Sequence, residues 1–421
     1  MSDKSAPALR ELDTCVQRFA RWLKEYGETS WDFQTFYASP LGRKAKQLYY
    51  RHKLLGTLAV APIIFCEAMI PSARRLFFVR QRFPIADAHY AMAFASRFEV
   101  TRHDVDYRQA VHFLEVLLDT RCESRTGYAW GYPFAWEGIS GTVPIGTPLI
   151  TTLPYVYEAF SQVYAIDRQE RWLQVMRGIA EHAFHDYRDI PTSARAATAA
   201  YTPEPNDPGM IVNASAYRAF LLTKAAFELG NDAYLAKARR NMHFVMEVQN
   251  GDGSWPYSVE GKRPFIDHFH TCFVLKALAK IDRLDPASGC RPTLERGVAY
   301  YATQLFDDAG LPRPFAKPPR LIVYRRELYD YAESINIMTL LRGQFPDLDR
   351  RWATVAADLV RRWQRADGSF RSRQLYVGWD DVPMHRWAQA QTFRGLCAWI
   401  ADDLARERGK VESSADIPAL R

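Results

Sequence analysis

Apolar residues recur at helical spacing along most of the chain, and the alternating pattern of β-strands is scarce. One such stripe ends near Gly27 and consists of Leu9, Leu12, Val16, Phe19, Trp22 and Leu23. Because side chains three and four residues apart lie on one face of a helix, this spacing indicates a helix with a buried face. The same periodicity in the following segments predicts an all-α protein.

Two kinds of helix alternate from residue 87 onward. The first kind is rich in small residues and apolar around most of its circumference, as in 214–222 and 271–279, which is typical of a fully buried helix. These helices recur at intervals of about 60 residues, a period that signals an internal repeat. Their expected starts lie near Asp87, Thr151, Asn213, Asp267, Tyr329 and Met384.

Helices of the second kind are amphipathic and carry charged faces, such as Lys237, Arg239 and Arg240. They are predicted at 107–121, 171–187, 233–249, 294–305 and 351–364. A helix with one apolar and one charged face lies at a protein surface, so these helices form an outer layer. We expect a sixth outer helix from the N-terminal segment, closing the ring against the C-terminal helix.

The links from outer to inner helices are long, and one turn motif recurs in them. Asp-Gly-Ser-Trp at 252–255 returns as Asp-Gly-Ser-Phe at 367–370, and each is preceded by a glutamine, Gln249 or Gln364. Weaker echoes lie at 129–132 and 309–312. Asp-Gly is a natural helix stop, and we expect the following aromatic residue to fill the gap between neighbouring hairpins. Periodicity of this length indicates stacked helical hairpins.

Six buried helices inside six amphipathic ones define an (α/α)6 toroid. The Gln-x-x-Asp-Gly-Ser-Trp turns followed by apolar helices resemble the six-hairpin glycosidase, lyase and epimerase superfamily, and they are also similar to the terpenoid cyclase and prenyltransferase toroids. We expect an N-terminal helical segment at 1–84 that packs on and closes the ring, the toroid at 85–405, and a tail at 406–421. The toroid hosts many chemistries, so the resemblance indicates architecture more than reaction.

Three further motifs carry a narrower resemblance. They are Tyr201-Thr-Pro, Asn213-Ala-Ser-Ala-Tyr217 and Asp267-His-Phe-His-Thr-Cys272. Together they resemble an uncharacterised bacterial group associated with polysaccharide biosynthesis. This resemblance implies a carbohydrate-active enzyme with an oligosaccharide or polysaccharide substrate.

Composition restricts the class of partner. With 48% hydrophobic and 14% aromatic residues in 421, the chain can bury a large core. Its formal net charge of +7 is modest, and basic residues are scattered except at 43–53 and 74–82. Without a nucleic-acid-binding motif, this charge favours an acidic glycan over DNA or RNA.

The cysteines and the N-terminus suggest a cytoplasmic protein. The six cysteines are far apart, form no Cys-x-x-Cys pair, and follow no charged-then-apolar leader. The apolar stretch 54–66 is interrupted by Pro62 and is too short to span a bilayer, so we expect a buried helix there. The alternative is peripheral contact with the inner membrane, or with a synthase complex, through the basic and apolar residues 51–82.

Polar and aromatic residues gather where the inner helices begin. In a toroid these helix starts and the long loops before them converge at one end, and aromatic rings there can stack on sugar faces while polar groups bind hydroxyls. The predicted substrate-binding residues are Asp87, His89, Trp130, Tyr132, Trp136, Tyr201, Trp255, Tyr329, Trp379, His385 and Arg386. The plain alternative is that Asp87, Asn213 and Asp267 cap helices and that the Trp residues fill gaps.

The predicted catalytic residues are His270, His268, Tyr217, Asn213, Asp267 and Glu333. His268 and His270 are two residues apart, so only one of them can face the cavity if both lie on a helix. In one chemistry, a histidine removes the proton alpha to a uronic acid carboxylate, and a tyrosine delivers a proton. Asn213 and Arg386 would hold the carboxylate. Lyase members of the superfamily use Asn, His, Tyr and Arg in these roles, so the resemblance implies a lyase or a C5-epimerase.

Other chemistries remain open. Two carboxylates could hydrolyse a glycoside, chosen from Asp87, Glu137, Asp267, Glu333 and Asp380. Zinc on Asp267, His270, Cys272 and His385 would follow the prenyltransferase toroids, but Cys272 falls in an apolar run and the spacing matches no standard site, so no metal and no soluble cofactor is expected. A terpenoid cyclase would need a concentrated Asp motif in the cavity, and the sequence does not contain the expected one. The rival from another class is a non-catalytic glycan-binding component of a polysaccharide synthase complex.

Overall fold

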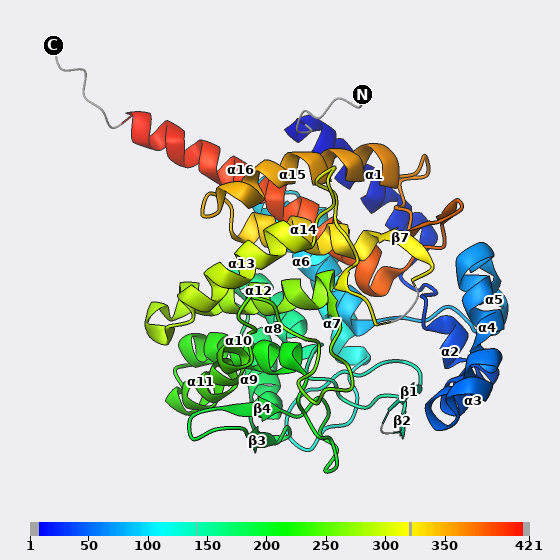
Figure 1. Cartoon of the computed structure of the whole chain (residues 1–421). Coiled ribbons are helices and arrows are strands. Elements are labelled where there is room, and N and C mark those ends of the chain that lie inside the picture. The colour runs from blue at the N-terminus through cyan, green and yellow to red at the C-terminus, as the bar shows by residue number, and fades with distance from the viewer. Residues whose placement is uncertain (1–7, 140, 320–321, 416–421) are drawn as a thin grey trace.

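In the computed structural model, which describes residues 8–139, 141–319 and 322–415, the small-residue-rich helices form a closed inner ring (Figure 1). Each inner helix packs against the next one along the chain, and the last packs against the first. The ring consists of α6 (Pro84–Thr101), α8 (Leu153–Asp167), α10 (Val212–Leu229), α12 (His268–Leu284), α14 (Leu328–Leu340) and α16 (Ala390–Ala415).

The amphipathic helices lie outside this ring. They are α7 (Asp104–Asp119), α9 (Glu170–His185), α11 (Asp232–Glu247), α13 (Arg291–Gln304) and α15 (Pro346–Asp358), with α1 (Leu9–Tyr26) from the N-terminus packed against α16. The predicted (α/α)6 toroid is therefore confirmed.

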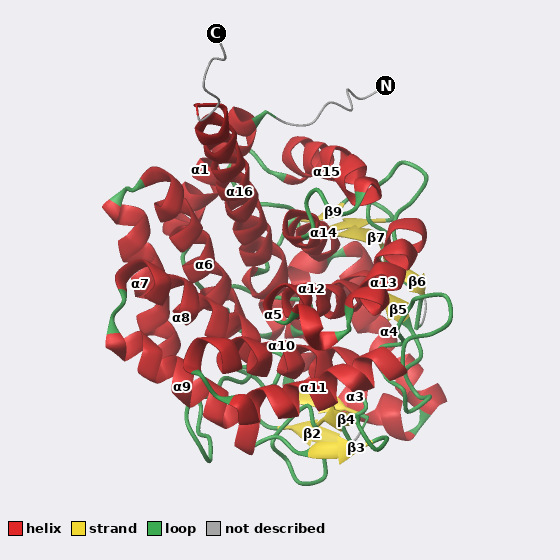
Figure 2. Cartoon of the chain, turned by 90° about the vertical axis from the view of Figure 1, so that its left-hand side faces the viewer, coloured by secondary structure: helices red, strands yellow, loops and turns green. Residues whose placement is uncertain are grey.

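Inner and outer helices are joined by connections of two lengths. The inner-to-outer turns are short: α6 and α8 end at Arg102 and Arg168 in the left-handed conformation, and α10 ends at Gly230 in the same conformation. Such residues stop a helix by satisfying its last carbonyl groups. The outer-to-inner links are long and carry short antiparallel strands, drawn in yellow in Figure 2. All the long loops thus gather where the inner helices begin.

These loops contain four small sheets in the described chain. They pair β1 (Trp136–Gly138) with β2 (Gly141–Val143), β3 (Asp189–Pro191) with β4 (Ala197–Ala199), β5 (Ile266–Asp267) with β6 (Phe315–Lys317), and β7 (Tyr324–Glu327) with β8 (Arg373–Leu375), which also pairs with β9 (Trp379–Asp380). Each sheet stiffens a loop that leads into an inner helix.

The repeated Asp-Gly turns fix each hairpin to the next outer helix. Gly253 has φ +90°, and a Cβ at this position would lie 2.4 Å from the carbonyl oxygen of Arg296 in α13. Gly368 has φ +97° and approaches the carbonyl oxygen of Arg18 in α1 just as closely. Only glycine adopts this conformation at such a distance without strain. Because the two turns contact α13 and α1 in the same way, α1 occupies the sixth outer position.

The glutamines before these turns have matching roles. Gln249 donates from Nε2 to the carbonyls of Gly253 and Thr293, both at 3.0 Å. Gln364 donates to the carbonyls of Gly368 at 3.1 Å and Cys15 at 2.8 Å. Each glutamine therefore joins its own turn to the neighbouring outer helix.

Residues 35–77, which connect α1 to α6 along the chain, form a further set of helices. They are α2 (Thr35–Ala38), α3 (Pro40–Arg51), α4 (Lys53–Met69), a 3-10 turn η1 (Pro71–Ala73) and α5 (Arg74–Phe77). Figure 1 shows α3 and α4 as a pair at the edge of the molecule, outside both rings. The expectation that 54–66 is a buried helix is wrong, because Leu54, Leu58 and Phe65 are exposed. Residues 1–7 and 416–421 of the predicted tails lie outside the described residues.

Candidate active site

The beginnings of the inner helices surround one cavity of about 260 Å³. Its walls are mostly aromatic, and residues from all six inner repeats and from the N-terminal segment contribute to them. The lining residues are Phe33, Gln34, Ile85, Tyr132, Phe134, Trp136, Thr151, Tyr155, Tyr201, Asn213, Tyr217, Tyr257, Phe269, His270, Phe273, Tyr329, Arg386 and Trp387. A large aromatic hollow with a few convergent polar groups is the usual form of a small-molecule or sugar site.

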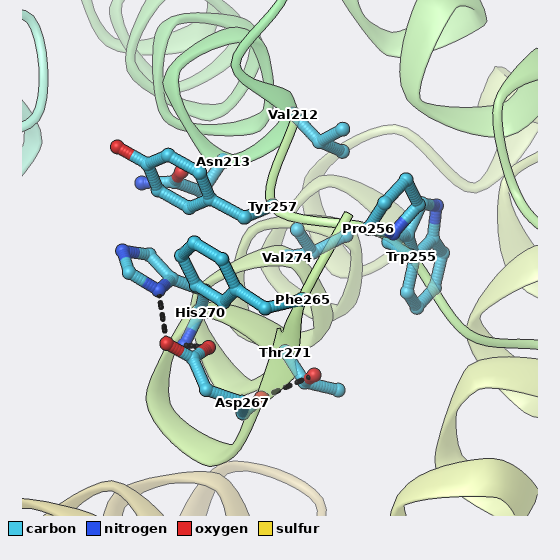
Figure 3. Close-up of a pocket in the computed structure, with 10 residues that line it drawn as sticks. All are labelled: Val212, Asn213, Trp255, Pro256, Tyr257, Phe265, Asp267, His270, Thr271 and Val274. Carbon is cyan, nitrogen blue, oxygen red and sulfur yellow. Dashed lines mark hydrogen bonds and ion pairs between the residues drawn. The ribbon is translucent and has the colours of Figure 1, made fainter. Parts of the chain in front are cut away.

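His270 and Asp267 form a hydrogen-bonded pair at the beginning of α12. The Asp267 Oδ1 atom accepts from the backbone N–H of His270 at 3.1 Å and so caps the helix. Its Oδ2 atom accepts from His270 Nδ1 at 2.6 Å. Since a carboxylate only accepts hydrogen bonds, Nδ1 carries the proton, and the lone pair of neutral His270 is on Nε2. Figure 3 shows this second nitrogen pointing away from Asp267.

The His270 ring is held in a cage of aromatic rings. The Tyr257 ring lies 4.5 Å from it at an interplanar angle of 62°, and the Phe273 ring lies 5.4 Å away. Figure 3 shows Tyr257 and Phe265 beside His270, with Asn213 next to Tyr257. The His270 side chain is 23% exposed and Asp267 only 2%, so the imidazole reaches the cavity while the carboxylate stays beneath it. This arrangement fits a general base with a fixed orientation.

Asn213 belongs to the first turn of α10, which begins at Val212. Its side chain is 3% exposed, and its Oδ1 atom has no hydrogen-bond partner among the described residues. A buried acceptor without a partner is unfavourable in a protein, so Asn213 Oδ1 can accept a hydrogen bond from a hydroxyl or amide that enters the cavity.

Two tyrosines in the cavity wall are linked to a buried ion pair. The hydroxyls of Tyr155 and Tyr217 lie 2.5 Å apart, and Lys276 Nζ donates to Tyr155 at 3.2 Å. Lys276 also pairs with Glu333 Oε2 at 2.5 Å. Burial alone would lower the pKa of Lys276, but the Glu333 carboxylate outweighs it, and the pKa is raised. The chain from Lys276 through Tyr155 to Tyr217 can therefore bring a proton to the cavity.

Arg386 lies on a π-helical turn, η4 (His385–Gln389), immediately before α16. Its Nε is 2.7 Å from Asp32 Oδ2, and both side chains are about 1% exposed. The guanidinium stacks 3.6 Å from the centre of the Trp387 ring and 4.6 Å from that of Tyr132. Its Nη1 and Nη2 atoms are buried and form no well-aligned hydrogen bond with a described residue. Arg386 lines the cavity, and the two parallel N–H groups of a guanidinium fit a carboxylate.

Most of the predicted aromatic residues line the same cavity. Tyr132, Trp136, Tyr201 and Tyr329 all contribute to its wall. Tyr329 stacks on Trp387 at 5.5 Å and 11°. The structure therefore brings together eight predicted residues: His270, Tyr217, Asn213, Tyr132, Trp136, Tyr201, Tyr329 and Arg386.

Three predicted histidines do not reach the cavity. His268 is fully buried in the ring wall, where Nδ1 contacts the carbonyl of Leu305 at 3.1 Å and Nε2 lies 2.8 Å from Ser334 Oγ. His385 lies between the N-terminal segment and α6, with Nε2 3.0 Å from the carbonyl of Gly27. His89 lies behind Tyr155, with ring centres 4.5 Å apart. The prediction that these three histidines act on or bind the substrate is therefore wrong, and they stabilise the fold instead.

Burial keeps these histidines neutral. It lowers the pKa of His268 and of His385 to about 3. The pKa of His89 falls well below its usual value, through burial first and then through Arg394 and Lys276. In His268 and His385 both ring nitrogens are bonded, and such a neutral imidazole stabilises the fold and cannot exchange protons with a substrate.

The predicted carboxylates are withdrawn from the cavity by cations or hydroxyls. Asp87 pairs with Arg82, Asp380 with Arg74 at 2.5 Å, and Glu333 with Lys276. Glu137 is buried and accepts from Thr142 at 2.8 Å. Within the described residues, no Asp or Glu lines the main cavity; Asp267 only borders the small pocket beneath His270. The predictions that Glu333 is catalytic and that Asp87 binds substrate are therefore wrong.

Three predicted tryptophans serve the packing instead. Trp130 is fully buried and donates from Nε1 to the carbonyl of Leu117 at 2.7 Å. Trp255 donates to the carbonyl of Val245 at 2.9 Å and borders only the small pocket. Trp379 packs edge-on against Trp363, with ring centres 5.1 Å apart. These three Trp residues therefore fill gaps in the packing, which was the alternative to a role in substrate binding.

Several residues that line the cavity or bind to its lining were not predicted from the sequence. Asp32, Phe33 and Gln34 come from the N-terminal segment, which lies far from the repeats in sequence. Lys276 lies two turns inside an apolar helix, where a single lysine gave no signal of contact with Tyr155. The only hint in the sequence was a lysine within an apolar stretch of a helix expected to be buried, since lysine is rarely buried without a partner.

Comparison with solved structures supports the fold, whereas comparison with sequences finds nothing: no family model and no curated protein matches this chain. The unsaturated glucuronyl hydrolase of Bacillus sp. GL1 superposes with a TM-score of 0.60 at 12% identity, covering 96% of this chain and 97% of that one. The cellobiose 2-epimerase of Bacillus thermoamylovorans gives 0.58 at 9% identity, covering 76% and 88%.

A polysaccharide lyase gives a TM-score of 0.52 at 12% identity, covering 76% of this chain and 90% of the lyase. These neighbours, an epimerase, a hydrolase and a lyase, are members of the (α/α)6-toroid superfamily. At such low identity the likeness establishes the shared toroid architecture and leaves the reaction to the site.

Proposed function

We propose that this protein is a carbohydrate-active enzyme that removes the proton alpha to the carboxylate of a uronic acid residue, as a C5-epimerase or a lyase of bacterial polysaccharide metabolism. One observation carries the proposal. A carboxylate-held imidazole, His270, lines the same cavity as Arg386, and no carboxylate pair lines that cavity in the described chain.

The proposed reaction begins when Arg386 binds the substrate carboxylate through Nη1 and Nη2. His270 Nε2 then takes the proton from C5, while Asp267 stabilises the imidazolium that forms. The charge that develops on the carboxylate oxygens is stabilised by the fixed guanidinium, and Asn213 orients a neighbouring hydroxyl. Aromatic residues such as Tyr329 and Trp136 pack against the sugar rings.

Two outcomes can follow proton removal. If the C4–O bond breaks, a C4=C5 double bond forms and Tyr217 gives its proton to the departing oxygen, with Tyr155 and Lys276 restoring that proton. If the bond stays intact, a proton returned to the opposite face of C5 produces the epimer. The choice depends on the linkage at C4, and both outcomes use the same base.

The alternatives have less support from the cavity. Hydrolysis by an acid–base pair of carboxylates requires two of them on either side of the bond, and the candidates are paired with cations or hydroxyls outside the cavity. The aromatic walls would suit a terpenoid cation, but no acidic cluster faces them among the described residues. A purely binding role would not require the Asp267–His270 pair.

The test is incubation of the purified protein with uronic-acid-containing glycans in D2O. Deuterium at C5, seen by NMR, or the ultraviolet absorbance of a C4=C5 double bond would report proton abstraction. We expect the His270→Ala variant to lose about 10²–10⁴-fold in kcat. Release of new reducing ends without deuterium at C5 would establish hydrolysis instead, and glycan binding without any product would establish a binding protein.

A further inference from the structure

The hairpin of α3 and α4 has one face packed and one face uncovered. Gly56 permits a close approach, since a Cβ there would lie 2.0 Å from the Cα of Tyr49 in α3. The buried residues of α4 follow at helical spacing and are Gly56, Val60, Ile63 and Glu67. The hairpin is therefore a built element of the fold, held together along one row of α4.

The opposite row of α4 is apolar and points to solvent. Leu54, Leu58 and Phe65 are 85%, 71% and 58% exposed, and Leu76 beyond the helix is 88% exposed. In the described chain, ten of the sixteen exposed large hydrophobic residues lie between Leu41 and Val79. Such a concentration on a soluble surface marks an interaction site.

The same segment carries the positive charge of the molecule. Residues 40–82 contain nine Lys and Arg and one acidic residue, Glu67, an excess of eight, whereas the whole chain has a net charge of +7. Lys44, Arg51, Lys53 and Arg75 are exposed and form no ion pair with a described residue. Arg74 and Arg82, in contrast, are paired with Asp380 and Glu28. The outward face is therefore both apolar and cationic.

The geometry of the hairpin restricts how it could meet a membrane. No single helix in the described parts of the chain is long and apolar enough to cross a bilayer, and the α4–α5 pair that passes together is bent by 116°. At 1.5 Å per residue, the 17 residues of α4 span about 25 Å, less than the roughly 30 Å of a hydrocarbon core. A helix of this kind lies in the interface plane with its apolar row inserted.

We propose that the α3–α4 hairpin and α5 dock this protein on an anionic lipid surface. Leu54, Leu58 and Phe65 insert among the acyl chains, and Arg51 and Lys53 contact the acidic headgroups. A second copy of this chain would place two segments of excess charge eight against each other, so the charge disfavours self-association through this face. The proposal is independent of the proposed enzymatic activity.

Docking through the hairpin would place the lipid surface near the cavity. α3 packs against β1, and Trp136 of β1 lines the cavity wall. A glycan held at a membrane surface would then meet the protein on the side that carries this part of the wall.

The test is flotation of the full chain with vesicles of phosphatidylcholine alone or mixed in equal parts with phosphatidylglycerol. We expect binding to the mixed vesicles only, weakening as NaCl is raised. Arg51→Gln with Lys53→Gln should weaken binding about 30-fold, and Leu58→Glu at least tenfold. The matched controls are Arg21→Gln with Lys24→Gln on α1 and Val105→Glu on α7, which change exposed residues elsewhere and should bind as the parent does.

Every other result overturns the proposal. Equal binding to both vesicles, or binding unchanged by Leu58→Glu, would show that the cationic apolar face is not the lipid contact. No vesicle binding, with a dimer in light scattering that Leu58→Glu dissociates, would show that a second copy covers the face. No vesicle binding by a monomer would leave the face to a protein partner. Activity on a soluble glycan is expected to be the same in all these variants.

Discussion

At the scale of single residues, the distinction between His268 and His270 determines the chemistry. The two rings are separated by one residue and project from α12 in different directions, one into the wall between Tyr301 and Ser334 and one into the cavity. Identical side chains in one helical turn thus have opposite environments: a fixed neutral ring with bonded nitrogens, and a ring whose Nε2 has no hydrogen bond to a described residue. The second is the one that can act as a base.

Asp267 is expected to act through His270. In Asp267→Asn the amide can still accept from Nδ1 but cannot stabilise an imidazolium by charge, so we expect kcat to fall about 10–100-fold, following the loss typical of an altered orienting partner. The acid limb of the pH–rate profile should shift to lower pH, because an imidazolium without the neighbouring carboxylate is less stable and loses its proton more readily. A merely structural role would lower the protein yield and leave that profile unchanged. The measurement is kcat against pH for both proteins.

Arg386 is expected to bind the substrate carboxylate. Lysine keeps the charge in Arg386→Lys but offers a single donor group in place of two parallel N–H groups, so we expect KM to rise and kcat/KM to fall about tenfold or more. The comparison is between a uronic acid substrate and its methyl ester, which lacks the carboxylate charge. If both substrates lose equally in the variant, Arg386 does not recognise the carboxylate.

At the scale of elements, the Asp-Gly turns hold the rings in register. Asp252 Oδ1 accepts from the N–H and hydroxyl of Ser254 at 2.9 and 2.6 Å, which closes the turn and places Trp255 against α13 at Gly297. The equivalent turn at 367–370 does the same with α1. One motif therefore connects hairpins at two places around the toroid.

Gly253 is expected to be sensitive to substitution and its neighbour Gly251 insensitive. In Gly253→Ala the new Cβ meets the Arg296 carbonyl at φ +90°, so we expect the free energy of unfolding to fall by about 1–3 kcal/mol. Gly251 has open space around its Cβ position, and Gly251→Ala should change stability by less than about 0.5 kcal/mol. Urea unfolding of both variants decides; equal losses would exclude the close contact as the cause.

At the scale of the whole molecule, stability is expected to depend on the buried histidines. His268 and His385 have pKa values lowered to about 3 by burial, against 6.5 for an ordinary imidazole. Between these values the unfolded chain binds protons that the folded protein does not, so the free energy of unfolding falls as the pH falls from about 6.5 towards 3. Asp87 opposes this trend, because burial, only partly offset by Arg82, raises its pKa to about 7.

The contribution of one histidine can be isolated. His268→Asn is expected to be less stable than the parent at pH 7, because hydrogen bonds in the wall are lost. Between pH 6 and pH 4 its free energy of unfolding should fall less steeply than that of the parent, and the two slopes should differ by about 1.4 kcal/mol per pH unit. The exposed His103→Asn is the matched control and should keep the slope of the parent. An unchanged slope in His268→Asn would mean that this ring titrates normally in the folded protein.

The architecture followed from the sequence because it depends on local and repeated features. An apolar helix must be covered on all sides and an amphipathic one on a single side, so their alternation leaves few arrangements other than two concentric rings. The turns at Gly253 and Gly368 and the aromatic residues around the cavity belong to the same repeat and could be located with it. The residues that gather at the beginnings of the inner helices followed from that geometry.

Side-chain direction and long-range pairing were decided only by the tertiary structure. Whether His270 or His268 faces the cavity depends on where α12 begins, and sequence spacing gives helix ends only to within a turn. The pairing of Arg386 with Asp32 joins residues at opposite ends of the chain, and the cation that withdraws Glu333 lies on another helix. The exposure of Leu54, Leu58 and Phe65 was likewise hidden, because an apolar helix has the same sequence whether its second face meets protein or solvent.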